Sequence, residues 1–296
     1  MSPKLCLGTV QFGLPYGITN KSGQVDELEV KNILADASKA GFSWLDSAQA
    51  YGDAESVIGR NLPVEHNFQL VSKLPAQRQS IFTANHVSIW EQSLQLSLSR
   101  LGISCLDSLL LHSTDDLRKP GAEFLKEWLF GLKERGLVRR LGVSIYEACD
   151  LGPVDSELLD LVQLPLSLYD QRLLQNGTIT YLRSQGCLVH ARSLYLQGLL
   201  LTPADRWPSW IDQATRDHHA KLGAFAAGHA RSLLECALDF ARVQQELDGV
   251  VLGVCSRAQL DQLLKAWVMP PFLQDQGWHV WSIKDSFSLD PRRWPR

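Results

Sequence analysis

The sequence has no long hydrophobic segment. No apolar stretch in its 296 residues reaches the ~18 residues that a membrane-spanning helix needs. The start, Met1-Ser2-Pro3-Lys4, leads directly into a short strand-like run and lacks the apolar core of a signal peptide. We therefore expect a cytoplasmic protein that does not bind a membrane.

The sequence also lacks an excess of charge of either sign. It has 29 Lys and Arg residues against 32 Asp and Glu residues, which gives a formal net charge of -3. Nucleic-acid-binding domains are usually strongly basic, so this balance argues against such a partner. With 45% hydrophobic residues, the chain has the composition of a globular protein, and a small-molecule partner fits it better.

Cysteine and histidine motifs are missing too. The six cysteines show no CxxC pair and no spacing typical of a disulfide framework, so we expect buried thiols. They are Cys6, Cys105, Cys149, Cys187, Cys236 and Cys255. His218, His219 and His229 lack the HExxH spacing of zinc sites. We expect these histidines at the surface, and no metal centre.

What the sequence has throughout is an alternation of short, β-rich apolar runs with helical segments, a pattern typical of βαβ units in a parallel sheet. The eight apolar runs are residues 5–7, 43–45, 69–72, 108–111, 141–143, 161–164, 187–191 and 249–252. Helical segments are expected over residues 27–40, 87–101, 123–135, 213–244 with at least one break, and 257–267.

Eight such units predict an α/β fold of the (β/α)8 TIM-barrel type. No Pro/Gly-rich linker divides them, so we expect a single domain over residues 1–296. An open, doubly wound sheet would produce similar local patterns and is the alternative. The tryptophan-rich segment from about residue 268 to residue 296 is expected to pack across the barrel as a tail.

Polar residues follow several of the apolar runs. Asp46 follows the second run, Lys73 the third and His112 the fourth, and Tyr51 lies shortly after Asp46. In a (β/α)8 barrel, catalytic groups sit at the C-terminal ends of the strands, which share one rim. We therefore expect these four side chains to converge, although each taken singly has an ordinary structural explanation.

Together, these four residue types can transfer a proton. A free tyrosine has a pKa of ~10 and needs a nearby cation to become an effective acid, which Lys73 can supply. A lysine among apolar residues needs a counter-charge, which we assign to Asp46. His112 can hydrogen-bond a substrate carbonyl oxygen and stabilise the negative charge that develops on it.

Several motifs, found in the expected order, resemble those of the aldo/keto reductase superfamily. They are Leu7-Gly8-Thr9 with Phe12-Gly13, Asp46-Ser47-Ala48 with Tyr51-Gly52, and Ser97-Leu98-Ser99-Arg100-Leu101-Gly102 followed by Asp107 and His112. The resemblance runs from the first strand to the last helix. It implies an NAD(P)H-dependent oxidoreductase that reduces an aldehyde or ketone to an alcohol.

The same resemblance implies roles for the four polar residues. Asp46, Tyr51, Lys73 and His112 occupy the positions of the family's catalytic tetrad. Tyr51 would be the general acid in reduction and the general base in the reverse direction. This agrees with the assignment made from chemistry alone.

The chain contains neither GxGxxG after a strand nor GxxxxGK[ST], so a Rossmann dehydrogenase is not expected. Barrels often bind phosphates near strands seven and eight, at a helix N-terminus. Gly253, Ser256, Arg257 and Gln259 occupy that place, although Ser256 and Gln259 also form a capping-box pattern that would start any helix. The resemblance implies that this segment binds the 2′-phosphate of NADP, so NADP(H) is favoured over NAD(H).

The resemblance supplies further candidate cofactor contacts. Ser144 and Gln163 resemble residues that hydrogen-bond the nicotinamide carboxamide, and Arg192, Ser193 and Gln197 follow the seventh strand. Arg192 stands where the family commonly has a tyrosine that stacks on the nicotinamide ring. A guanidinium can also stack there, although its charge disfavours the oxidised ring; a salt-bridged rim arginine is the other interpretation.

Two further positions depart from the family pattern, and two rival functions stay open. Ile145 and Leu263 replace asparagines that are common in the family. A nonenzymatic nicotinamide-binding sensor or regulatory subunit would retain the barrel but act through a protein partner. A lyase or isomerase would use Lys73 as a Schiff-base nucleophile, which the spacing of Tyr51 and His112 argues against. The sequence leaves the substrate and the oligomeric state open.

Overall fold

Eight parallel strands form a closed barrel in the order β1 to β8. The computed structural model describes residues 2–273, 275–284 and 286–295. The strands are β1 (Lys4–Gly8), β2 (Trp44–Asp46), β3 (Gln69–Leu74), β4 (Leu106–Leu111), β5 (Val138–Ser144), β6 (Leu161–Pro165), β7 (Leu188–Arg192) and β8 (Gly249–Gly253). Each of the eight expected runs overlaps one strand, and β8 pairs with β1. The (β/α)8 barrel is therefore confirmed and the open sheet is excluded.

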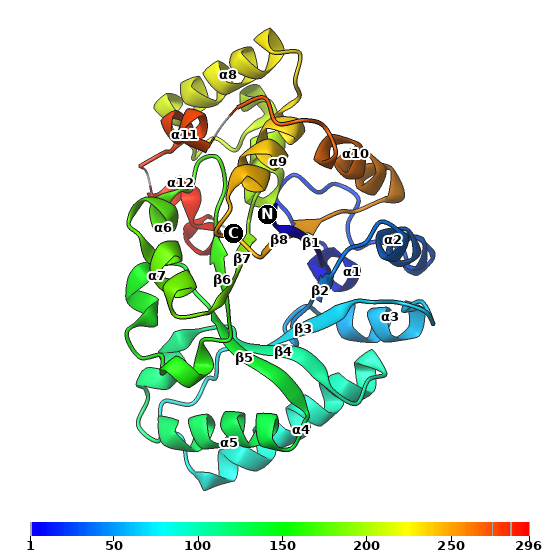
Figure 1. Cartoon of the computed structure of the whole chain (residues 1–296), viewed down its shortest axis with the longest axis vertical. Coiled ribbons are helices and arrows are strands. Elements are labelled where there is room, and N and C mark those ends of the chain that lie inside the picture. The colour runs from blue at the N-terminus through cyan, green and yellow to red at the C-terminus, as the bar shows by residue number, and fades with distance from the viewer. Residues whose placement is uncertain (1, 274, 285, 296) are drawn as a thin grey trace.

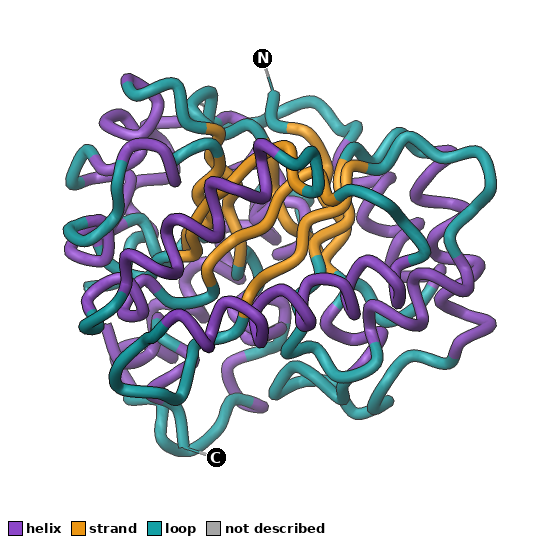
Figure 2. Tube along the Cα trace, turned by 90° about the horizontal axis from the view of Figure 1, so that it is seen from below, coloured by secondary structure: helices purple, strands orange, loops and turns teal. Residues whose placement is uncertain are grey.

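Helices surround the strands (Figure 1 and Figure 2). They are α1 (Val10–Gly13), α2 (Glu27–Lys39), α3 (Ala54–Asn61), α4 (Ala84–Leu101), α5 (Ala122–Glu134), α6 (Arg172–Gln175), α7 (Thr178–Ser184), α8 (Gln213–Gly228), α9 (Leu233–Val243), α10 (Arg257–Trp267), α11 (Asp275–Trp278) and α12 (Ser286–Leu289). Each helical segment expected from the sequence is present. The break expected between residues 213 and 244 separates α8 from α9, near Ala230, whose φ is 53°.

Local capping explains where two of these helices begin. Thr83 and His86 form a capping box at the start of α4. At the start of α10, the Ser256 hydroxyl accepts a hydrogen bond from the Gln259 N–H at 3.2 Å. The expected capping box is only half formed there, because the Gln259 side chain accepts from the Cys255 N–H at 2.7 Å instead.

The barrel interior is layered. Five apolar side chains, one from each of five strands, form a cluster within it: Cys6, Trp44, Val71, Leu110 and Leu161. Since side chains alternate along a strand, the residues two positions further on point the same way. These are Asp46, Lys73, His112 and Gln163, while the fifth position is Gly8, which has no side chain. A polar layer therefore lies above an apolar one, toward the C-terminal ends of the strands.

The C-terminal segment packs against the barrel side that carries α6 and α8 (Figure 1). Trp278 is fully buried, and its carbonyl accepts from the Gln171 side chain at 3.0 Å. The Trp281 carbonyl accepts from His218 Nε2 at 3.0 Å. The predicted extent of the domain, residues 1–296 with a tail from about residue 268, stays a prediction.

Two expectations about exposure are wrong. His219 is buried, with Nδ1 2.5 Å from the Tyr169 hydroxyl and Nε2 2.9 Å from the Thr202 carbonyl, so it is a structural residue. Cys149 is exposed, whereas Cys6, Cys187 and Cys236 are buried as expected. Cys105 and Cys255 are partly buried.

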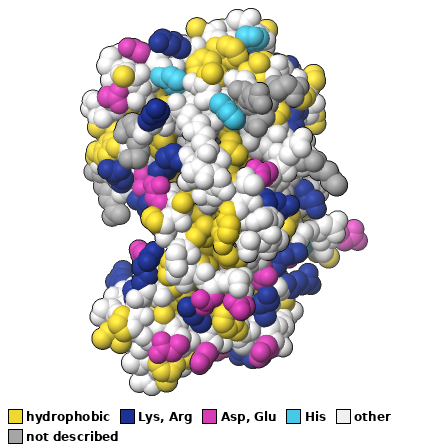
Figure 3. Space-filling view, turned by 60° about the vertical axis from the view of Figure 1, so that its left-hand side comes forward, with side chains coloured by type: hydrophobic (Ala, Val, Ile, Leu, Met, Phe, Trp, Pro, Cys, Tyr) yellow, Lys and Arg dark blue, Asp and Glu magenta, His cyan; other side chains and the backbone are white. Residues whose placement is uncertain are grey.

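No described helix is long and apolar enough to cross a membrane. On the face shown in Figure 3, basic and acidic side chains are interspersed. The described residues include no group of three or more His, Cys, Asp or Glu side chains that could hold a metal ion.

Substituting alanine for two helical glycines is expected to change stability in opposite directions. A Cβ at Gly59 in α3 would lie 2.0 Å from the Arg100 carbonyl oxygen in α4, whereas a Cβ at Gly131 in α5 would meet nothing within 4 Å. We expect Gly59→Ala to lower the free energy of unfolding by about 1–3 kcal/mol through overpacking. Gly131→Ala should raise it by up to about 1 kcal/mol, because alanine favours the helix. Urea denaturation measures both, and equal responses would contradict the close α3–α4 packing.

Candidate active site

A cavity of ≈ 660 Å³ opens at the C-terminal ends of the strands. This volume lies within the ~300–1,000 Å³ typical of small-molecule sites. Asp46, Tyr51, Lys73 and His112 all line it. The four residues that the sequence placed on one rim are thus brought together in one cavity.

Lys73 and Asp46 form a buried ion pair in this cavity. The Lys73 Nζ lies 2.8 Å from each carboxylate oxygen of Asp46 and donates to the Ser47 carbonyl, also at 2.8 Å. The Lys73 side chain is only 1% exposed. Burial lowers the pKa of Lys73, and Asp46 opposes that shift by favouring the charged form.

Gln163 holds Asp46 from the barrel interior. Its side-chain nitrogen donates to Asp46 Oδ1 at 2.5 Å, and its oxygen has no hydrogen-bond partner among the described residues. Gln163 does not belong to the cavity lining. Its nitrogen therefore positions Asp46, and the carboxamide contact that the resemblance implies for Gln163 stays a prediction.

Tyr51 lies next to the ion pair. Its hydroxyl oxygen is 3.5 Å from the Lys73 Nζ. Burial raises the pKa of Tyr51, the Asp46 charge raises it further, and Arg192 opposes both. Because both Asp46 oxygens contact Lys73, the pair presents little net positive charge to Tyr51. Arg192 is the cation that opposes the rise in this pKa, and the role expected for Lys73, whose Nζ lies 3.5 Å from the hydroxyl, stays a prediction.

His112 faces Tyr51 across the cavity. Their rings are T-shaped, with centroids 6.0 Å apart. Burial, together with the charges of Lys73 and Arg192, lowers the pKa of His112 to about 3. The imidazole is therefore neutral near pH 7, with one ring nitrogen able to donate a hydrogen bond and the other able to accept one.

The candidate cofactor residues divide into two groups. Six line the cavity: Ser144, Arg192, Ser193, Gln197, Gly253 and Gln259. Ser256 caps α10, and Arg257 lies on the outside, where its Nε contacts Asp36 Oδ2 of α2 at 2.7 Å. The Arg257 N–H donates to Glu29 at 2.6 Å. The cation expected to bind phosphate is thus already paired with α2.

The segment after β7 has a strained backbone where it lines the cavity. Ser193, Leu196 and Gln197 have φ values of 63°, 47° and 56°, in the left-handed region that non-glycine residues rarely adopt. The Gln197 carbonyl accepts from the Thr19 hydroxyl at 3.2 Å, which joins this segment to the loop after α1. Such strain clusters at ligand clamps. The sequence carries no signal for it.

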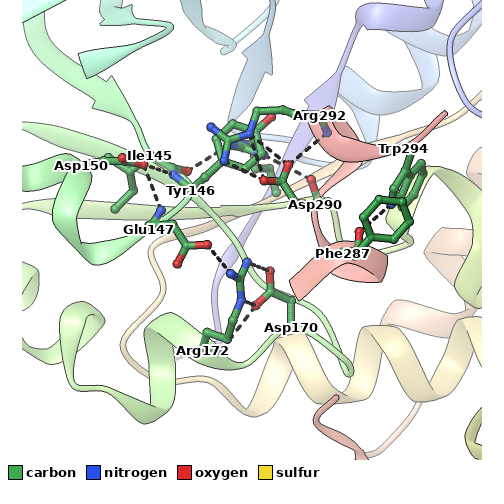
Figure 4. Close-up of polar contacts among 12 residues, drawn as sticks. Ile145, Tyr146, Glu147, Asp150, Asp170, Arg172, Phe287, Asp290, Arg292 and Trp294 are labelled. Carbon is green, nitrogen blue, oxygen red and sulfur yellow. Dashed lines mark hydrogen bonds and ion pairs between the residues drawn. The ribbon is translucent and has the colours of Figure 1, made fainter. Parts of the chain in front are cut away.

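Sequence reasoning missed the aromatic residue that follows β5. Tyr146 lines the cavity, between Arg192 from β7 and Arg292 from the C-terminal segment. Figure 4 shows Arg292 and Asp290 beside Tyr146. The position of Tyr146 directly after Ser144-Ile145, at the end of a predicted strand, could have indicated that it lines the site. Nothing in the sequence indicates that Arg292 contacts it.

The cavity has features that fit an extended polar ligand such as a dinucleotide. It runs from Tyr51 to the start of α10, where Gln259 and Gln262 line it. The Gln11 side-chain oxygen and the Tyr195 hydroxyl are buried without hydrogen-bond partners among the described residues, and both residues line the cavity. Buried polar atoms normally have partners, so a polar ligand would satisfy them.

Comparison with known proteins gives one consistent family. The family model described as "Aldo/keto reductase family" matches residues 4–281. An aldo-keto reductase from Strobilurus tenacellus is 24% identical over 265 residues, covering 83% of this chain and 71% of that protein. The L-galactose dehydrogenase of Arabidopsis thaliana is 23% identical over 298 residues, covering 88% of this chain and 85% of that protein.

A solved structure agrees on the fold. An aldo-keto reductase from Bacillus halodurans superimposes with a TM-score of 0.73 at 19% identity, covering 96% of this chain and 95% of that one. The fold follows from that likeness, and the family follows from the model that spans nearly the whole chain. The chain belongs to the aldo/keto reductase family of oxidoreductases, which act on carbonyl compounds with a nicotinamide cofactor.

Proposed function

We propose that this protein reduces an aldehyde or ketone to an alcohol, with Tyr51 as the general acid. The observation that carries the proposal is the Tyr51 hydroxyl, which lies 3.5 Å from the buried Lys73 Nζ in a cavity shared with His112. The bound dinucleotide would supply a hydride to the carbonyl carbon. Reduction is the proposed physiological direction.

In this proposal, Tyr51 and His112 act on the carbonyl oxygen. Tyr51 is protonated at neutral pH, since even an ordinary tyrosine has a pKa of ~10, and in this proposal it gives that proton to the oxygen as the hydride arrives at carbon. Neutral His112 donates a hydrogen bond to the same atom and stabilises its developing negative charge. Because His112 is neutral, it can donate this hydrogen bond while Tyr51 transfers its own proton to the oxygen.

The Lys73–Asp46 pair positions Tyr51 and fixes the local field. Lys73 donates to Asp46 and to the Ser47 carbonyl and is nearly inaccessible, which disfavours it as a Schiff-base nucleophile. In alcohol oxidation, the same Nζ would stabilise the Tyr51 phenolate that must form. The lyase or isomerase alternative therefore has little structural support.

The cofactor preference is a finer proposal. Ser144, Ser193, Gln197 and Gly253 line the cavity and are proposed to contact the dinucleotide. NADP(H) is favoured over NAD(H) because the resemblance implies that Ser256, Arg257 and Gln259 bind the 2′-phosphate. If NADP(H) is used, its 2′-phosphate must compete with the carboxylates of α2 that hold Arg257. Parallel fluorescence titrations with NADPH and NADH test this preference.

Replacing the proposed acid should stop turnover. We expect Tyr51→Phe to lower kcat/KM for aldehyde reduction by ~10²–10⁴-fold, the usual contribution of general acid catalysis, while dinucleotide affinity is retained. Steady-state kinetics and dinucleotide fluorescence measure the two effects. Tyr181→Phe is the matched control, because Tyr181 lies exposed in α7 and outside the cavity.

Two outcomes of that experiment would contradict the proposal. If neither dinucleotide binds the wild-type protein, the oxidoreductase assignment fails. If a dinucleotide binds tightly, no aldehyde is turned over and Tyr51→Phe changes nothing, the sensor alternative is supported.

The pH dependence should differ between the two directions. His112 stays neutral because its pKa is about 3, and Tyr51 stays protonated because its pKa is raised. We expect kcat/KM for reduction of a neutral aldehyde to be flat from about pH 5 to 8, and alcohol oxidation to rise with pH as Tyr51 loses its proton. An inflection in reduction near ~6.5, the ordinary histidine pKa, would contradict a neutral His112.

The buried ion pair predicts a non-additive effect on stability. Lys73→Met leaves Asp46 as an uncompensated buried charge and should lower the free energy of unfolding by about 3–5 kcal/mol. Adding Asp46→Asn should restore much of that loss, although not the activity. The exposed Lys265–Asp261 pair is the control, and Lys265→Met should change stability little. Additive losses in urea denaturation would contradict the pairing.

A further inference from the structure

Arg192 carries a positive charge that none of the described carboxylates balances. At the end of β7 it is half-buried, and its guanidinium donates to the Ile145 carbonyl at 3.0 Å and to the Ser193 hydroxyl at 3.3 Å. Both acceptors are neutral. None of the carboxylates that the structure describes lies within ion-pair distance of Arg192. The salt-bridged rim arginine considered from the sequence is therefore not what the described chain shows.

Tyr146 holds this guanidinium in place. The Arg192 Cζ lies 4.0 Å from the Tyr146 ring centroid, and the Arg292 Cζ lies 3.5 Å from it. Two guanidinium groups cannot occupy one face of a ring at these distances, so they lie on opposite faces. Arg292 is neutralised by Asp290 at 2.7 Å (Figure 4). Arg192 is thus oriented by stacking and is the member of this stack whose charge stays unbalanced.

Arg192 also lies close to the groups proposed to act on the carbonyl. It lines the same cavity as Tyr51 and His112. Its charge acts to lower the pKa of both side chains. An anion bound at Arg192 would therefore share the cavity with a carbonyl oxygen held between Tyr51 and His112.

We propose that the substrate is an anionic carbonyl compound whose carboxylate or phosphate binds Arg192. The inference rests on the proposed function, whose substrate class it names. A planar guanidinium suits both anions, because it donates in a fork that matches two of their oxygens. Stacking on the nicotinamide, the alternative role, would place this charge against the positive oxidised ring.

Matched substrate pairs test the proposal. Comparing kcat/KM for succinic semialdehyde and butanal tests whether a substrate carboxylate is recognised. Comparing glyceraldehyde phosphate and glyceraldehyde tests the same for a phosphate. In at least one pair the wild-type kcat/KM should favour the anionic member, and that pair identifies the anion. Arg192→Gln should lower this anionic-to-neutral ratio ~10–100-fold, the value of one charged hydrogen-bonding group. Arg192→Lys keeps the positive charge but loses the paired guanidinium donors, so it should lower this ratio less than Arg192→Gln does.

A binding measurement and a control complete the test. Calorimetry with succinate, an unreactive anion, on the dinucleotide-loaded protein should show binding that Arg192→Gln weakens. Lys21→Gln removes an exposed charge from the same cavity and should leave the ratio unchanged. Equal loss of ratio in both variants would overturn the inference, because a diffuse positive field would then suffice.

Two other results would also overturn the inference. One is a wild-type ratio near unity for both pairs. The other is an Arg192→Gln variant that loses dinucleotide affinity and all substrates equally, which would assign Arg192 to the cofactor. Failure of the proposed function looks different, because the wild-type protein would then reduce neither member of either pair with either dinucleotide.

Discussion

The ion pair between Lys73 and Asp46 is the constraint on which the site depends. Both groups are buried, and removing either partner would leave a charge that costs several kcal/mol. The pair forms because β2 and β3 are neighbours whose inward-facing positions above Trp44 and Val71 are polar. Gln163 adds a third contact to Asp46 from β6, and the Lys73 Nζ lies within 3.5 Å of the Tyr51 hydroxyl. The barrel therefore positions Tyr51, the proposed acid, next to a buried charge that is already satisfied.

The electrostatics divide the polar layer into positioning and reacting groups. Lys73 and Asp46 cancel much of each other's charge, so burial dominates Tyr51 and His112 and keeps both neutral at neutral pH. Arg192 is a half-buried cation of the cavity that lacks a carboxylate partner among the described residues. A site with neutral donors around the carbonyl oxygen and such a cation in the same cavity is suited to an anionic carbonyl substrate. Tyr146 couples that cation to the C-terminal segment through Arg292.

The sequence predicts those features that depend on local periodicity. Alternating apolar runs predict the eight strands, and strand-end polarity predicts that Asp46, Lys73 and His112 meet, because parallel strands end on one rim. Contacts between distant segments carry no such signal. His219 is buried by Tyr169 and Thr202, so the prediction of a surface residue was wrong. Arg257 contacts Asp36, 221 positions away in the chain, a pairing that no local pattern indicates, and its contact with the cofactor stays a prediction. The left-handed φ values at Ser193 and Gln197 also arise from tertiary packing and leave no pattern in the residue types.

The central claim is that this cavity joins hydride transfer to carbon with proton transfer to oxygen. The most direct measurement is isotopic: the protein reduces an aldehyde in ordinary water with a dinucleotide that carries deuterium as the transferable hydrogen at nicotinamide C4, and mass spectrometry locates the label. We predict one deuterium on the former carbonyl carbon of the alcohol, and none there when the label is in the solvent instead. Solvent-derived hydrogen on that carbon, or reduction without any dinucleotide, would contradict the account.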